Sequence, residues 1–131
     1  RARACDPNSL VAGLFSHLTA ASAEIEGRSY GGGALELEPN EAERVLVRDA
    51  TALHAALSLE ECDKLVRAKQ LDAVLAENDR LLLRGALGLS LSDCVSLKAI
   101  WMKMQQRRFD RRRRRREGQL GELQRHSSAA V

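Results

Sequence analysis

Apolar residues recur at helical spacing near the start of the chain. Between residues 10 and 25 they fall on one face of a helix, and Asp6-Pro7-Asn8-Ser9 provides residues that often begin one. Gly27 is placed to end it. The pattern therefore predicts one amphipathic helix that buries Leu10, Val11, Leu14, Phe15, Leu18 and Ile25.

The segment after this helix changes character. Three consecutive glycines, residues 31–33, rule out a stable helix. Residues 34–38 then alternate apolar and acidic side chains, which predicts a short strand with one buried face. Pro39-Asn40 ends that strand and begins a helical turn over residues 41–44, and residues 45–47 are expected to be extended.

Helical periodicity resumes at Leu53. Ser58 and Glu61 form a capping-box pattern, which begins a helix that is expected to end near Lys69. The next helix carries five apolar core positions, Leu71, Val74, Leu75, Leu82 and Leu83.

A break and a final helix follow. Gly85 and Gly88 mark the break, and Ser90-Leu91-Ser92-Asp93 begins the last helix. The fold class predicted from the whole pattern is mostly α (α+β): a helical region with one short strand or hairpin after the Gly-rich loop, and a long basic C-terminal helix. The apolar stripe of that last helix is Cys94, Leu97, Trp101 and Met104.

Composition bounds the number of domains. The chain has 131 residues, of which 44% are hydrophobic and 30% charged, as in a single globular domain. We predict a domain over residues 1–116 and a polar, disordered tail over residues 117–131. Because the first residue is Arg1, we expect the chain to be cut from a longer one.

No segment indicates export or membrane insertion. The sequence has no stretch of about eighteen apolar residues and no signal-peptide pattern. The three cysteines, Cys5, Cys62 and Cys94, are too widely spaced for a zinc motif, and we expect reduced thiols in the core. The protein is therefore expected to be cytoplasmic, without a membrane partner.

Charge is segregated along the chain. Residues 1–100 contain 11 Lys/Arg and 15 Asp/Glu, whereas residues 101–131 contain 10 and 3. Arginine suits phosphate because its planar fork donates two hydrogen bonds and keeps its charge. The basic residues of the last helix, Lys103, Arg107, Arg108 and the run from Arg111 to Arg116, are therefore predicted to contact nucleic acid. Six consecutive arginines point around the whole helix, so some must be solvated, and the alternative is a solvated tail without a partner.

The Gly-rich loop is the second candidate site. Glycines let backbone amides approach an anion, Ser29 can donate to a phosphate, and Tyr30 can stack or form a hydrogen bond. A flexible entry into the strand explains the loop equally well. Together the two features give the predicted binding residues Arg28, Ser29, Tyr30, Gly31, Gly32, Gly33, Lys103, Arg107, Arg108, Arg111, Arg112 and Arg115.

The chain carries no recognisable catalytic set. The histidines His17, His54 and His126 are isolated from partner motifs. Glu36 and Glu38 share one face of the predicted strand and are either a metal-binding pair or, as we favour, the solvated face of an edge strand. We predict no catalytic, cofactor-binding or metal-binding residue.

Part of the chain resembles the C-terminal region of bacterial DNA methyltransferases that belong to restriction-modification systems, depend on S-adenosylmethionine and modify adenine. The similar segments are residues 14–24, the loop 27–33 and Leu35-Glu36-Leu37-Glu38-Pro39. The similarity covers roughly residues 8–110, and its specific part is confined to residues 14–48. Arg48 departs from it, because similar sequences often have proline there.

The resemblance implies a parent enzyme whose upstream catalytic domain binds S-adenosylmethionine and flips the target adenine. The signature of that domain, Asn/Asp-Pro-Pro-Tyr/Phe, is absent from this chain. By resemblance, then, the chain completes the binding of double-stranded DNA beside the catalytic domain and binds no cofactor itself. Two alternatives remain: a stand-alone basic protein that binds nucleic acid, and a helical protein-interaction module.

Overall fold

The computed structural model describes residues 7–30, 33–48 and 57–128, with side chains as far as residue 120. This part of the chain is mostly helical, with one two-stranded antiparallel hairpin, which confirms the predicted fold class. The elements, in chain order, are α1 (Pro7–Leu14), α2 (His17–Glu26), β1 (Arg28–Ser29), β2 (Leu35–Glu36), α3 (Pro39–Ala42), α4 (Leu59–Arg67), α5 (Leu71–Asn78), the π-helix η1 (Asp79–Ala86) and α6 (Leu91–Ser128).

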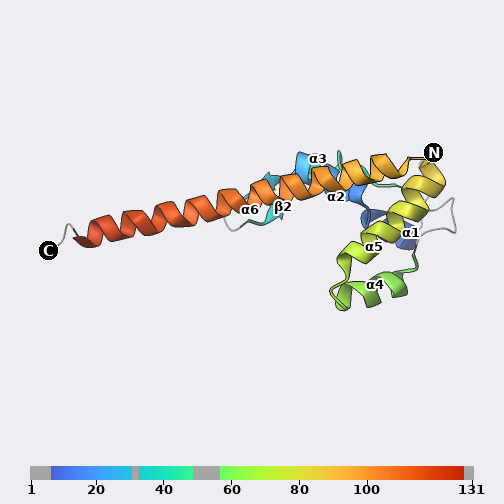
Figure 1. Cartoon of the computed structure of the whole chain (residues 1–131), viewed down its shortest axis with the longest axis horizontal. Helices are drawn as coiled ribbons and strands as arrows, with labels where there is room; N and C mark the ends of the chain where they lie inside the picture. Colours follow the sequence, from blue (N-terminus) through green and yellow to red (C-terminus); the bar gives the residue numbers. More distant parts are fainter. Residues whose placement is uncertain (1–6, 31–32, 49–56, 129–131) are drawn as a thin grey trace.

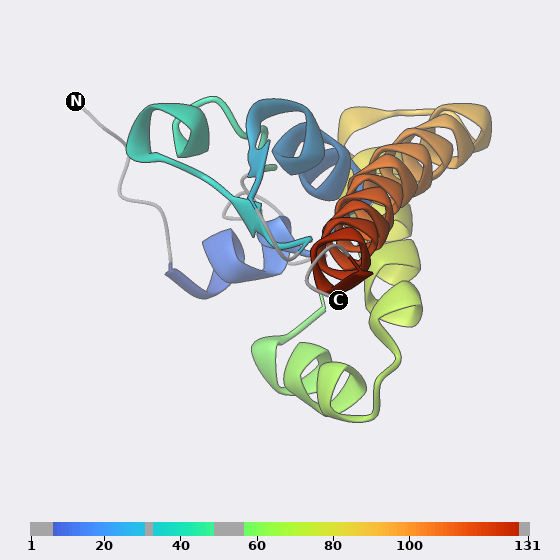
Figure 2. The same ribbon diagram turned by 90° about the vertical axis from the view of Figure 1, so that its left-hand side faces the viewer.

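Helix α6 organises the molecule. Its first half packs along α2, and its second half projects well beyond the body (Figure 1). Figure 2, a view nearly along α6, shows the elements of residues 7–48 on one side of this helix and α4 below it. The projecting half of α6 carries the arginine run, of which Arg112 still lies next to Gly33.

The predicted N-terminal helix is two helices. The chain breaks at Phe15-Ser16, and the Ser16 hydroxyl caps α2 by accepting a hydrogen bond from the Thr19 amide at 3.2 Å. The predicted apolar face was also wrong, since Leu10, Val11, Leu14 and Ile25 are 38–59% exposed.

Small and polar residues of this segment are buried instead. Asp79 accepts hydrogen bonds from the His17 amide at 2.9 Å and from the His17 ring at 2.7 Å, and Asn78 donates to the Ala12 carbonyl at 3.2 Å. A Cβ at Gly13 would lie 2.2 Å from the Arg48 carbonyl oxygen. The buried faces of α1 and α2 are therefore set by close backbone contacts and by buried hydrogen bonds. Most of the bulky apolar residues of these helices are left exposed.

The central helices follow the sequence more closely. Ser58 and Glu61 form the predicted capping box of α4, and Ser90 caps α6 through Asp93. Of the five apolar positions predicted inside, Val74, Leu75, Leu82 and Leu83 are at most 3% exposed, but the prediction was wrong for Leu71, which is 42% exposed at the first position of α5. Cys62 and Cys94 are buried free thiols, as predicted, and burial raises the pKa of each.

Four other expectations differ in detail or fall outside the described residues. The strand predicted over residues 34–38 is shorter and pairs with β1 in the register Arg28↔Glu36. Gly85 lies inside η1, and the chain leaves the helix only near Gly88. Residues 45–47 belong to no strand, and the helical start at Leu53 lies outside the described residues.

Helix α6 does not end where the polar tail was predicted to begin. It continues through residue 117 to Ser128. The segment contains no proline, and arginine, glutamate, glutamine and leucine are good helix formers. Arg113 and Glu117 also form an i,i+4 ion pair at 3.8 Å, which favours helix over coil.

Candidate functional site

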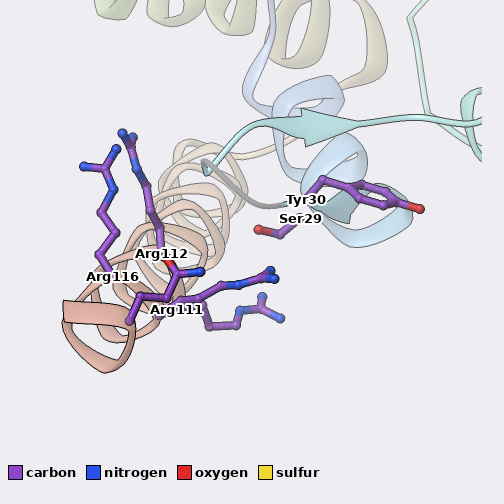
Figure 3. Close-up of a pocket in the computed structure, with 7 residues that line it drawn as sticks. Ser29, Tyr30, Arg111, Arg112 and Arg116 are labelled. Atoms are coloured by element: carbon purple, nitrogen blue, oxygen red, sulfur yellow. The ribbon is translucent and has the colours of Figure 1, made fainter. Parts of the chain in front are cut away.

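The Gly-rich loop and the arginine helix form one cleft of about 520 Å³. Figure 3 shows the Ser29 hydroxyl directed toward α6, whereas the Tyr30 ring is directed away from it. Two features that are some eighty residues apart in the sequence are therefore parts of one surface. The cleft is lined by Ser29, Tyr30, Arg111, Arg112, Arg115, Arg116 and Gln119.

The cleft is strongly cationic. Four guanidinium groups line it, and none of its lining residues is acidic. The Nε of Arg112 is buried and has no hydrogen-bond partner among the described residues. A surface with several free guanidinium donors and a nearby hydroxyl is suited to an anion with many oxygen acceptors, such as a chain of phosphates.

Arg108 holds the two walls of the cleft together. Its Nη2 lies 2.7 Å from Glu24 Oε1 and its Nε 3.1 Å from Glu24 Oε2, so the fork is bidentate. Its Nη1 donates to the Gly33 carbonyl. The sequence placed Arg108 among the DNA-contacting residues; the structure buries it at 9% exposure against α2 and the loop, so its role is structural.

Gly33 allows the loop to pack closely against α6. Its φ of +78° lies in the left-handed region, where a side chain is strained. A Cβ at this position would also lie 2.8 Å from Cδ of Arg112. The glycine predicted to approach an anion is thus needed for close packing against the arginine helix. Gly31 and Gly32 lie outside the described residues.

The Gly33→Ala variant is expected to lose more than about 1 kcal/mol of unfolding free energy, because it adds backbone strain and a contact with Arg112. Chemical denaturation measures the loss. Gly118→Ala is the matched control: it lies in exposed helix with nothing near the added Cβ, and should gain about 0.5–1 kcal/mol. Equal stability of Gly33→Ala and the wild type would contradict this seating of the loop.

Arg28 is paired within the protein. Its Nε lies 2.5 Å from a Glu41 oxygen, and its Nη1 lies 3.6 Å from Glu38. The hydrogen bond to Glu41, followed by the charges of Glu38 and Glu41, raises the pKa of Arg28. Arg28 is thus less free to bind an anion than the sequence indicated, and it lies outside the cleft lining.

Glu41 joins α3 to β1 through its ion pair with Arg28. Its pKa is lowered mainly because its carboxylate accepts a hydrogen bond from the Glu38 amide, with Arg28 contributing. A lowered pKa means that this interaction stabilises the fold fully at neutral pH and is lost as the pH falls through that pKa. Glu38 lies outside β2, as the N-cap of α3, and pairs with Arg28 at 3.6 Å, so it does not share a strand face with Glu36 as the sequence predicted.

Two further predicted contacts, Arg107 and Lys103, lie outside the cleft. Arg107 lines a second hollow on α6 with Asp110, Arg111 and Arg114, and this hollow shares Arg111 with the cleft. Lys103 is exposed one turn earlier on the same helix. Sequence reasoning included Arg116 in the basic run but left it out of the predicted binding residues, and it missed Gln119 altogether. Their i+4 and i+7 spacing from Arg112 was the available signal.

The described residues include a buried histidine–carboxylate pair that lies outside the cleft. His17 and Asp79 form a buried pair that sequence spacing did not reveal, and the His17 ring lies beside Trp101 with centroids 5.4 Å apart and a tilt of 57°. The pair joins α2 to η1, and His17 Nε2 is buried without a hydrogen-bond partner among the described residues. Within the described residues, no group of three or more His, Cys, Asp or Glu side chains is arranged to hold a metal ion.

The fold and cleft define a mostly helical module with a cationic binding surface. Residues 1–83 match the family described as Type II methyltransferase M.Eco57I, C-terminal domain. The chain belongs to this family, which confirms the resemblance to the C-terminal region of a restriction-modification methyltransferase. Comparison with curated proteins and with solved structures found no match. In the described part of the chain, no helix is long and apolar enough to cross a membrane.

Proposed function

We propose that this domain grips double-stranded DNA for an adenine-specific methyltransferase. The observation that carries the proposal is the cleft, in which Ser29 and four arginines from a distant segment face one space. Phosphate contacts of this kind fix the register and orientation of a protein on a duplex, whereas base contacts specify sequence. The domain then acts as the backbone-gripping part of the enzyme, in the compartment that holds the bacterial genome.

The methyl transfer itself is assigned to a catalytic domain. Adenine specificity and S-adenosylmethionine as the methyl donor rest on the resemblance of residues 14–48 to adenine-modifying enzymes. The present chain lacks the Asn/Asp-Pro-Pro-Tyr/Phe signature and a Gly-rich cofactor loop after a strand. We therefore expect the cofactor to bind the partner domain and not this one.

A docking surface for that catalytic domain is available on the body. Ile25, Leu46 and Ile100 are 59%, 57% and 43% exposed, and they surround a shallow hollow of about 310 Å³ that also includes Leu18 and Leu97. An exposed apolar patch with polar residues at its rim, here Glu26 and Arg44, suits contact with another protein domain. This hollow and the cleft involve different residues, so both partners can bind together.

DNA binding by the chain is expected to depend steeply on salt. The four cleft arginines displace about four counterions, so the slope of log K against log salt should be about −4 or more negative. Fluorescence anisotropy of a labelled duplex at several salt concentrations measures it, with unrelated duplex sequences as the specificity control. Absence of binding at low salt, or a slope near zero, would refute the proposed function.

A further inference from the structure

The arginines of α6 point in several directions, and only some of them line the cleft. At about 3.6 residues per turn, Arg112 and Arg116 lie roughly 140° to 180° around the axis from Arg107 and Arg114. The first pair faces the cleft, and the second pair lines the hollow with Asp110 on another face. A flat phosphate surface reaches one of these rows and leaves the other in water.

The helix is also free to be surrounded. From residue 113 to residue 120 every side chain is exposed, and this part of α6 extends past the body (Figure 1). The body packs on the side of α6 that carries the buried Arg108, while the roughly opposite side carries Arg113, which is 74% exposed. A ligand can therefore approach between the two arginine rows without meeting the body.

We propose that residues 107–116 of α6 lie in the major groove of DNA, with the two arginine rows contacting the phosphates of opposite strands. The major groove is about 12 Å wide and admits one α-helix, which is about 10–12 Å across with its side chains. Helices that extend freely from their domains bind DNA in this way. This inference rests on the proposed function and specifies the geometry of that same site.

The geometry also gives the cleft a specific occupant. One strand passes between α6 and Ser29, where the four cleft arginines, Arg111, Arg112, Arg115 and Arg116, contact its phosphates. The other strand passes on the far side of α6, where Arg107 and Arg114 face outward. A groove with two phosphate walls brings both arginine rows into contact with phosphates, whereas a single phosphate track reaches only one of them.

Two measurements on the full chain test separately whether the outer row, Arg107 and Arg114, contacts phosphates and whether α6 occupies the major groove. Arg107→Gln/Arg114→Gln should make the salt slope less negative by about 1.8, because two phosphate contacts are lost. Lys64→Gln/Arg67→Gln on α4 removes the same charge and should leave the slope unchanged. A duplex carrying glucosylated 5-hydroxymethylcytosine keeps its phosphates but fills the major groove, and should bind at least tenfold more weakly than the unmodified duplex.

Two results overturn the inference. One is an unchanged slope for Arg107→Gln/Arg114→Gln, which places the DNA against the cleft row alone. The other is equal affinity for the glucosylated duplex, which places α6 outside the major groove. Neither result affects the proposed function, which fails only if the unmodified duplex does not bind or binds without a salt dependence.

Discussion

Replacing Arg108 by methionine is expected to lower the unfolding free energy by about 3–5 kcal/mol, the largest stability change among the variants considered. The change leaves the Glu24 carboxylate buried without its bidentate partner and removes the donor to the Gly33 carbonyl. Urea denaturation measures the loss, on the assumption of two-state unfolding for a chain of this size.

Two further variants distinguish the loss of the ion pair from a general destabilisation of α6. Arg107→Met changes the neighbouring, exposed residue and should cost less than about 0.5 kcal/mol. The double variant Glu24→Leu/Arg108→Met replaces both charges by apolar groups and should recover much of the lost stability. If Arg108→Met is as stable as Arg107→Met, the pair does not hold the loop to the helix.

The triple variant Arg111→Gln/Arg115→Gln/Arg116→Gln is expected to weaken duplex binding roughly 10²–10³-fold at about 0.1 M salt. Three phosphate contacts are lost, so the salt slope should also become less negative by about 2.7. All three side chains are exposed and glutamine is a good helix former, so the thermal midpoint should barely move. Anisotropy and a thermal melt of the same sample measure both properties.

The matched control removes three positive charges from another surface. Lys64→Gln/Arg67→Gln/Lys69→Gln changes exposed residues on α4 and the turn after it. If affinity depends only on net charge, the control and the cleft variant will weaken binding equally. Equal weakening would show that the cleft is not the binding site.

Sequence patterns predicted those parts of the fold that depend on local signals. The caps at Ser58 and Ser90 and the apolar positions Val74 and Leu82 needed only neighbouring residues to be recognised. The N-terminal helices failed because their buried face is set by long-range polar partners. Asp79 binds His17 across 62 positions, and no helical periodicity reveals such a pair.

The candidate site was predicted as two separate features. The segregation of charge indicated the arginine run, and the three consecutive glycines indicated the loop. Nothing in the sequence indicated that the run and the loop line the same cleft. The same limitation explains Arg108. It was predicted to contact phosphate because it is an arginine of the basic helix, but it is buried and paired with Glu24, which lies 84 positions away in the sequence. Similarly, Arg28 was expected to be free, and its partner Glu41 is brought beside it by the hairpin and α3.

The central claim is that the loop and the arginine helix form one DNA-binding site, and an amide NMR titration of the chain with a short duplex tests it most directly. The account predicts that the amides of Ser29, Tyr30 and residues 111–119 shift together and give a single Kd, while those of α4 stay in place. Shifts confined to α6, with Ser29 and Tyr30 unmoved, would contradict it.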